Sequence, residues 1–86
     1  MPVVVRVAGF TIFFFSNEGN PREPVHVHIR RGGGLAKFWV NPVRLAENRG
    51  FAARTLNEIE ALVEVHETRI LEVWREHFSN GGQNRR

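Results

Sequence analysis

The chain contains no cysteine and no tyrosine among its 86 residues, and it has a single methionine. The absence of cysteine excludes disulfide bonds, zinc ribbons, iron–sulfur clusters and thiol nucleophiles, and it favours a reducing compartment. The longest apolar run, residues 10–15 with Thr11 inside it, is much shorter than the roughly 20 residues of a membrane-spanning helix. The first residues also lack the pattern of a signal peptide. We therefore expect a cytoplasmic protein.

Charge is distributed unevenly along the chain. Residues 1–51 contain seven basic and three acidic residues, whereas residues 52–78 contain three basic and six acidic ones. A basic first part is typical of a surface that meets an anion, and an acidic second part of one that meets a basic partner.

The first half of the sequence predicts strands. Pro2, Gly9, the polar stretch 16–23 and Pro42 separate segments that are rich in β-branched and aromatic residues. The expected strands span residues 3–7, 10–15, 25–30 and 35–40, with a short edge strand at 43–46.

The second half predicts one helix. From Leu56 to His77 the apolar residues recur at steps of three and four, which places them on one helical stripe. Ser79 and the glycines that follow it are typical of a helix end. We expect an α+β fold in which a small antiparallel sheet of four to five strands carries one long C-terminal helix packed across one face. Residues 1–79 would form a single domain, and residues 80–86 a disordered tail.

The segment from Val25 to Arg30 alternates strictly between apolar and polar residues, as a half-buried strand does. If Arg30 pairs with Leu35 across the glycine turn, every apolar pair of this hairpin lies on the core side. The opposite surface then carries the polar members of both strands and is bordered by Arg31. These residues are His26, His28, Arg30, Lys37 and Trp39.

This predicted surface has the residue types of a site for a phosphodiester. His26 and His28 could act as general base and general acid, since the unperturbed pKa of histidine is near 6.5. Arg30, Arg31 and Lys37 would bind the phosphate, and Trp39 could stack on a base. The scheme needs no metal and no cofactor, so the corresponding enzyme would be a metal-independent ribonuclease. Three alternatives stay open: a polar surface without catalysis, a protein-binding surface, and a metal site that uses the two histidines.

Two aromatic residues next to this surface are a second candidate site. If Ile12 and Phe14 face the helix, Phe13 and Phe15 face outward. Exposed aromatic side chains on a small protein are typical of a partner-binding surface.

Several motifs resemble those of small bacterial proteins that are grouped as domain of unknown function 4160. The resemblance covers about residues 1–78. The motifs that carry it are Met1-Pro2, Gly9-Phe10, Phe14 to Asn17, Pro24 to His28, Gly33 to Trp39, and Arg44 to Phe51. The resemblance implies a cytoplasmic bacterial protein that is paired with a second small protein, of the domain of unknown function 2442, in the manner of a toxin–antitoxin module.

Together these observations lead to one functional hypothesis and one alternative. The chain is expected to be the toxin-like component of such a module, binding or cleaving RNA through the polar surface. The alternative is a non-catalytic regulatory or antitoxin-side protein that binds its partner through the same surface.

Overall fold

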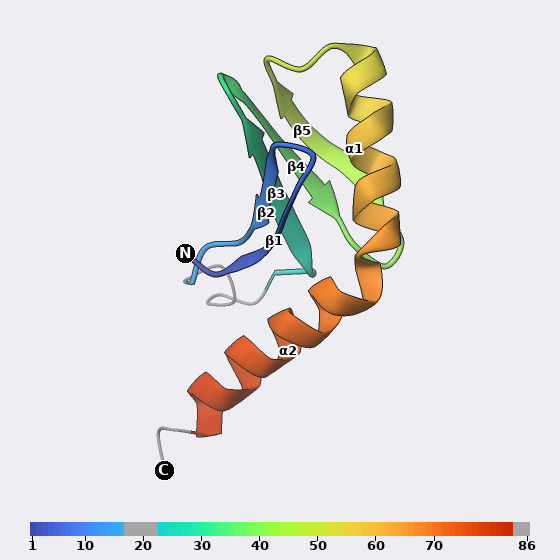
Figure 1. The fold of residues 1–86 in the computed structure, drawn as a ribbon. Coiled ribbons are helices and arrows are strands. Elements are labelled where there is room, and N and C mark those ends of the chain that lie inside the picture. Colours follow the sequence, from blue (N-terminus) through green and yellow to red (C-terminus); the bar gives the residue numbers. More distant parts are fainter. Residues whose placement is uncertain (17–22, 84–86) are drawn as a thin grey trace.

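The computed structural model describes residues 1–16 and 23–83, which form an antiparallel sheet of five strands followed by two helices (Figure 1). Each strand pairs with its neighbour in the sequence. This arrangement confirms the predicted α+β class and the sheet of four to five strands. The elements are β1 Val3–Val7, β2 Phe10–Phe13, β3 His26–Arg31, β4 Gly34–Trp39, β5 Arg44–Arg49, α1 Ala53–Val65 and α2 Glu67–Gln83.

The hairpin of β3 and β4 has the predicted register. Arg30 pairs with Leu35, His28 with Lys37, and His26 with Trp39. The turn between the strands contains Gly32, whose φ of 58° is a backbone conformation that glycine adopts readily.

Strand β5 is longer than the sequence suggests, since it extends from Arg44 to Arg49 rather than over residues 43–46. Its polar residues lack the apolar alternation of the other strands, so only the pairing with β4 identifies it. The pairing of β5 with β4 changes register between Lys37 and Phe38, as it does at a β-bulge.

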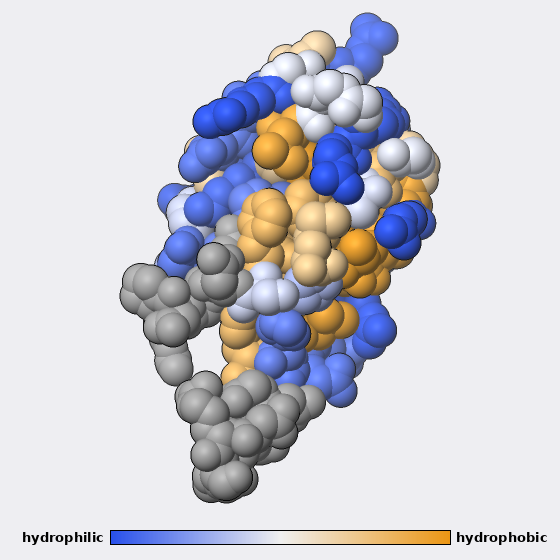
Figure 2. Space-filling view, turned by 90° about the vertical axis from the view of Figure 1, so that its left-hand side faces the viewer, coloured by the Kyte–Doolittle hydropathy of each residue, from blue (hydrophilic) through white to orange (hydrophobic). Residues whose placement is uncertain are grey.

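The core lies between one face of the sheet and the helices. Val27 and Ile29 of β3 are buried on this face, as the alternation predicts. They pack with apolar residues from the neighbouring strands and from both helices, and the buried members of this cluster are Phe10, Ile12, Val27, Ile29, Ala36, Phe38, Val40, Ile59, Val63 and Ile70. We call the opposite face of the sheet the open face. Figure 2, which views the molecule from the side away from helix α1, shows an apolar area surrounded by hydrophilic residues.

The prediction of one long helix packed across one face is wrong. Helix α1 ends at Val65 and α2 begins at Glu67, with His66 between them at φ −100° and ψ 12°. The His66 ring donates a hydrogen bond from Nδ1 to the carbonyl oxygen of Leu62 (2.8 Å), which also accepts the His66 backbone N–H (3.1 Å). A side chain that bonds to the helix backbone in this way promotes a bend. As a result α1 lies beside the sheet, whereas α2 continues past its end (Figure 1).

The predicted helix end also needs correction, because α2 continues beyond Ser79 to Gln83. Residues 84–86 of the expected disordered tail lie outside the described residues, as do residues 17–22 of the expected loop. Over the described residues, neither helix combines the length and the apolar character that spanning a membrane requires.

Candidate functional site

The open face carries rows of side chains that the strand register brings together. In one row, Thr11 pairs with Arg6 of β1 and with Arg30 of β3. Leu35 of β4 pairs with the same Arg30 and, on β5, with Arg49. Arg6, Arg30 and Arg49 are exposed, and we call them the arginine row. Since neighbouring strands lie about 4.8 Å apart, the row extends over roughly 19 Å from β1 to β5.

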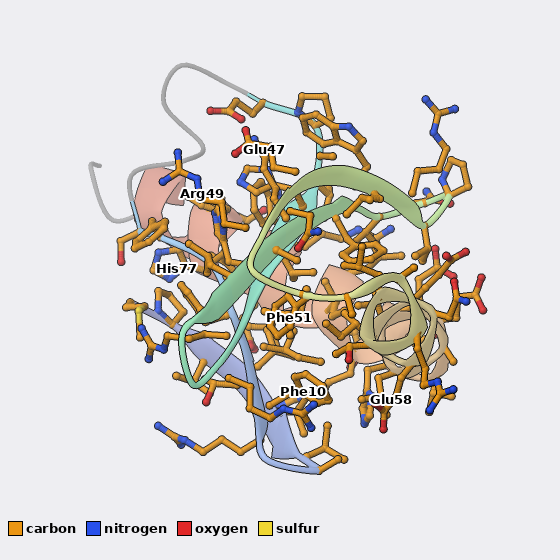
Figure 3. The ribbon with its side chains drawn as sticks, turned by 90° about the horizontal axis from the view of Figure 1, so that it is seen from above. Phe10, Glu47, Arg49, Phe51, Glu58 and His77 are labelled. Atoms are coloured by element: carbon orange, nitrogen blue, oxygen red, sulfur yellow. The ribbon has the colours of Figure 1, made fainter. Side chains whose placement is uncertain are left out.

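The next row combines aromatic and charged side chains. His28 pairs with Phe13 on one side and with Lys37 on the other, and Lys37 pairs with Glu47. Figure 3 shows Glu47 and Arg49 on the side of the sheet away from helix α1. The predicted grouping of His28, Arg30 and Lys37 on one face is therefore confirmed by the pairing.

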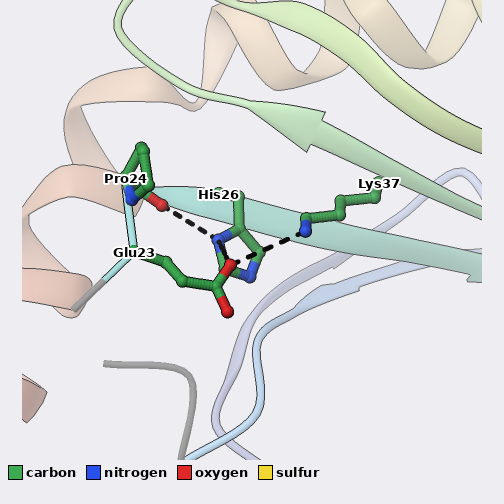
Figure 4. Close-up of polar contacts among 4 residues, drawn as sticks. All are labelled: Glu23, Pro24, His26 and Lys37. Carbon is green, nitrogen blue, oxygen red and sulfur yellow. Dashed lines mark hydrogen bonds and ion pairs between the residues drawn. The ribbon is translucent and has the colours of Figure 1, made fainter. Parts of the chain in front are cut away.

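His26 belongs to this face by alternation, but its side chain is fully buried rather than presented to a ligand. Its Nδ1 donates a hydrogen bond to the carbonyl oxygen of Pro24 (3.0 Å), and Oε1 of Glu23 lies 3.9 Å from the same nitrogen (Figure 4). The rings of His28 and Trp39 lie against it at centroid distances of 5.4 and 5.8 Å. The expectation that His26 and His28 are both exposed on one catalytic surface is wrong.

The course of helix α2 explains the burial of His26. Because the helices bend at His66, α2 passes the end of the sheet instead of remaining behind it. This brings the Trp74 ring to 5.3 Å from the His26 ring and to 5.1 Å from that of Phe14.

Lys37 lies between an acidic and an aromatic neighbour. Its Nζ is 3.7 Å from Oε1 of Glu23 (Figure 4) and 4.6 Å from the centroid of the Trp39 ring. The Lys37 side chain is 17% exposed and that of Glu23 is 41% exposed. The ammonium therefore covers part of the aromatic surface that the sequence suggested for base stacking, and a carboxylate already neutralises part of its charge.

Arg31 does not border the open face, contrary to the expectation. Its guanidinium lies over the Phe10 ring, with Cζ 3.8 Å from the centroid, and donates a hydrogen bond to the carbonyl oxygen of Ala8 (3.1 Å). Since Phe10 belongs to the core cluster, the Arg31 side chain lies on the core side of the sheet. Its contacts are those of a residue that closes the turn between β1 and β2.

Phe13 and Phe15 both lie toward the open face, but only one of them is exposed. Phe13 is 1% exposed, so the expectation that it offers a surface to a partner is wrong. Its ring stacks on that of His28 at 5.5 Å, and the Arg30 guanidinium lies 5.1 Å from its centroid. Phe15 is 41% exposed and contacts the rings of Phe13 at 5.4 Å and His28 at 4.9 Å.

Among the described residues, most of the exposed acidic side chains lie on the two helices, which also carry Arg54, Arg69 and Arg75. The exposed glutamates of the two helices are Glu58, Glu60, Glu64, Glu72 and Glu76. Basic residues predominate on the open face, where Arg44 adds to the arginine row and to Lys37. A surface with an excess of positive charge attracts anions. In the part of the chain that the structure describes, no three histidine, aspartate or glutamate side chains lie together as a metal site requires.

The sequence alone does not distinguish Arg6 and Arg49 from other surface charges. Arg6 is the one polar residue in a run of valines, and Arg49 lies in a strand that has no apolar alternation. Each is far from Arg30 in the sequence, and only the register from β1 to β5 places them in one row. The sequence signal for both arginines is a charged residue inside a strand, and it becomes informative once the neighbouring strand is known.

Comparison with known proteins identifies a family. The model of a family described as "Domain of unknown function (DUF4160)" matches residues 9–75. No curated protein and no solved structure matches the chain.

Proposed function

Because the chain belongs to the DUF4160 family, whose description gives no activity, we propose from the geometry of the open face that the protein binds RNA through its phosphate backbone. The arginine row is the observation that carries this proposal. Guanidinium groups recognise phosphates with two parallel hydrogen bonds, and a row of them across a sheet follows an extended chain of phosphates.

Lys37 extends the same surface. It lies in the row next to Arg30, and its ammonium can contact a phosphate as a point charge. Helix α1, on the core side of the sheet, carries the exposed Glu58, Glu60 and Glu64, which would repel a nucleic acid and so favour its binding at the open face.

We propose that the protein binds RNA without cleaving it. A general acid or base must come within hydrogen-bonding distance of the proton that it transfers. The buried His26 side chain donates from Nδ1 to the carbonyl oxygen of Pro24 and is surrounded by aromatic rings. His28 alone does not provide the acid–base pair that a metal-independent ribonuclease needs.

Replacing the arginines tests the proposal. Fluorescence anisotropy with a labelled single-stranded RNA gives the affinity of the chain and of its Arg30→Ala and Arg49→Ala variants at several salt concentrations. Each replacement should reduce the magnitude of the negative slope of log K against log salt concentration by about 0.7, as expected when one phosphate contact of a single strand is lost.

Arg54→Ala is the matched control, because it removes the same charge from an exposed position on helix α1. We expect its slope to equal that of the wild type. A wild-type protein that does not bind RNA, or equal slopes for all variants, would contradict the proposal.

A second candidate function is protein binding at the same face. Phe15 supports it, since a phenylalanine that is 41% exposed on a small domain is typical of an interface. The partner would be the second small protein of the module, of the domain of unknown function 2442, and in the toxin-like role it would block RNA binding by covering this face. Co-expression of the two proteins, followed by copurification of wild-type and Phe15→Ala chains, tests this candidate.

A further inference from the structure

We infer that Phe15 and His28 form a stacking site for an unpaired base, so that the ligand of the open face is single-stranded. This inference rests on the proposed function, because it names the form of RNA that the arginine row would bind. The site centres on the exposed Phe15 ring, which the rings of Phe13 and His28 hold in place.

The Phe15 ring is fixed by its neighbours. It stands nearly perpendicular to the Phe13 ring (88°, centroids 5.4 Å apart) and meets the His28 ring at 60° and 4.9 Å. Phe13 is itself buried and stacks on His28 with an interplanar angle of 28°. A ring that is already ordered loses little conformational entropy when a base stacks on it.

The position of the ring relative to the cations fits a nucleotide. His28 and Arg30 are two residues apart on β3, so their side chains lie on the same face at about 7 Å from each other. The Arg30 guanidinium contacts the Phe13 ring, and Lys37 is paired with His28 across the hairpin. A base on Phe15 therefore has cations for its phosphate on the neighbouring strands.

This arrangement discriminates between single-stranded and duplex RNA. In a duplex the bases are paired and stacked inside the helix, so their faces do not reach an aromatic side chain on a protein surface. Single strands expose these faces, and stacking on an aromatic ring tolerates every base. We expect binding that depends little on sequence and strongly on strandedness.

The test compares three probes on the full chain: a labelled oligoadenylate, a labelled RNA duplex, and inorganic polyphosphate as competitor. The wild type should prefer the oligoadenylate to the duplex. Phe15→Ala should weaken oligoadenylate binding by about 5- to 150-fold, the range expected for one lost stacking contact. The same variant should leave the inhibition constant of polyphosphate, calculated from the competition with the probe's own Kd, unchanged, because polyphosphate has no bases. Phe15→Tyr retains an aromatic ring and should keep most of the affinity.

Val65→Ala is the matched control, since Val65 is an exposed apolar residue on helix α1 (76%) and should not affect binding. Thermal unfolding by circular dichroism verifies that each variant is folded. Equal binding of oligoadenylate by Phe15→Ala and wild type, or a parallel loss for polyphosphate, would overturn the stacking site while leaving the arginine row intact. A wild type that binds neither oligoadenylate nor polyphosphate would overturn the proposed function as well.

Discussion

The carboxylate of Glu23 lies 3.7 Å from the ammonium of Lys37, at the border of the face that we propose for RNA. The Glu23 carboxylate therefore already neutralises part of the charge of the Lys37 ammonium. A phosphate that binds to Lys37 has to compete with Glu23.

Glu23→Gln should strengthen RNA binding for this reason. An exposed ion pair is worth about 0.2–1 kcal/mol, which corresponds to a gain in affinity of roughly 1.5- to 5-fold when the competitor is removed. The slope of log K against log salt concentration, which is negative, should also become steeper by up to about 0.7, since Lys37 becomes available for a phosphate. Glu60→Gln, at an exposed position on helix α1, is the control for the change in net charge. Equal affinity for the two variants would show that Lys37 does not contact the RNA.

His26→Ala should affect stability more than binding. The side chain is fully buried, bonds to the carbonyl oxygen of Pro24 and packs against Trp39 and Trp74. Its removal leaves a cavity and a carbonyl group without its donor, and we expect a loss of about 2–4 kcal/mol in the free energy of unfolding. His28→Ala should cost about 1 kcal/mol, because this half-buried ring loses its contacts with the rings of Phe13, Phe15 and His26.

Urea denaturation of both variants measures these losses. A small loss for His26→Ala, together with RNA cleavage by the wild type that disappears in this variant, would favour the catalytic alternative.

The hairpin of β3 and β4 could be predicted from the sequence because two independent signals agree. The alternation of Val25 to Arg30 defines the faces, and the glycine turn fixes the register with β4. A shift by one residue would bury Lys37 against Ile29, so the correct pairing is strongly preferred over this alternative.

The accessibility of His26 could not be predicted in the same way. It depends on the bend at His66, and the apolar spacing of the helical region continues across this residue without interruption. The bend is seen only in the structure, where α1 ends at Val65 and α2 begins at Glu67. One undetected change of direction in a helix thus altered the prediction for a residue 40 positions away in the sequence.

Gly34→Ala should destabilise the fold, although Gly34 lies in a strand. A Cβ atom at this position would overlap the Phe51 ring, with Cζ only 2.6 Å away. Because Phe51 packs against the core and contacts the Phe10 ring, it has little freedom to move. We expect a loss of about 1–3 kcal/mol, as for other overpacked sites.

Gly33→Ala is the matched control for this substitution, because a Cβ at Gly33 meets no atom within 4 Å. Combining Gly34→Ala with Phe51→Ala should remove the overlap, so the double variant should be less destabilised than the sum of the single changes. Additive losses in thermal or urea unfolding would contradict a direct clash between these residues.

The toxin-like role leads to a prediction in living cells. If RNA binding by the open face arrests growth, induced expression of the wild-type chain in a bacterial host should slow growth. Combining Arg30→Ala with Arg49→Ala should restore it, because two phosphate contacts are lost without a change in the core. Arg54→Ala should remain as inhibitory as the wild type, since its charge lies on helix α1. Immunoblotting verifies equal protein levels, and growth curves measure the effect. Normal growth with the wild-type chain would contradict the toxin-like role and favour a regulatory protein, whereas arrest by the double variant would show that the arginine row is not the surface responsible.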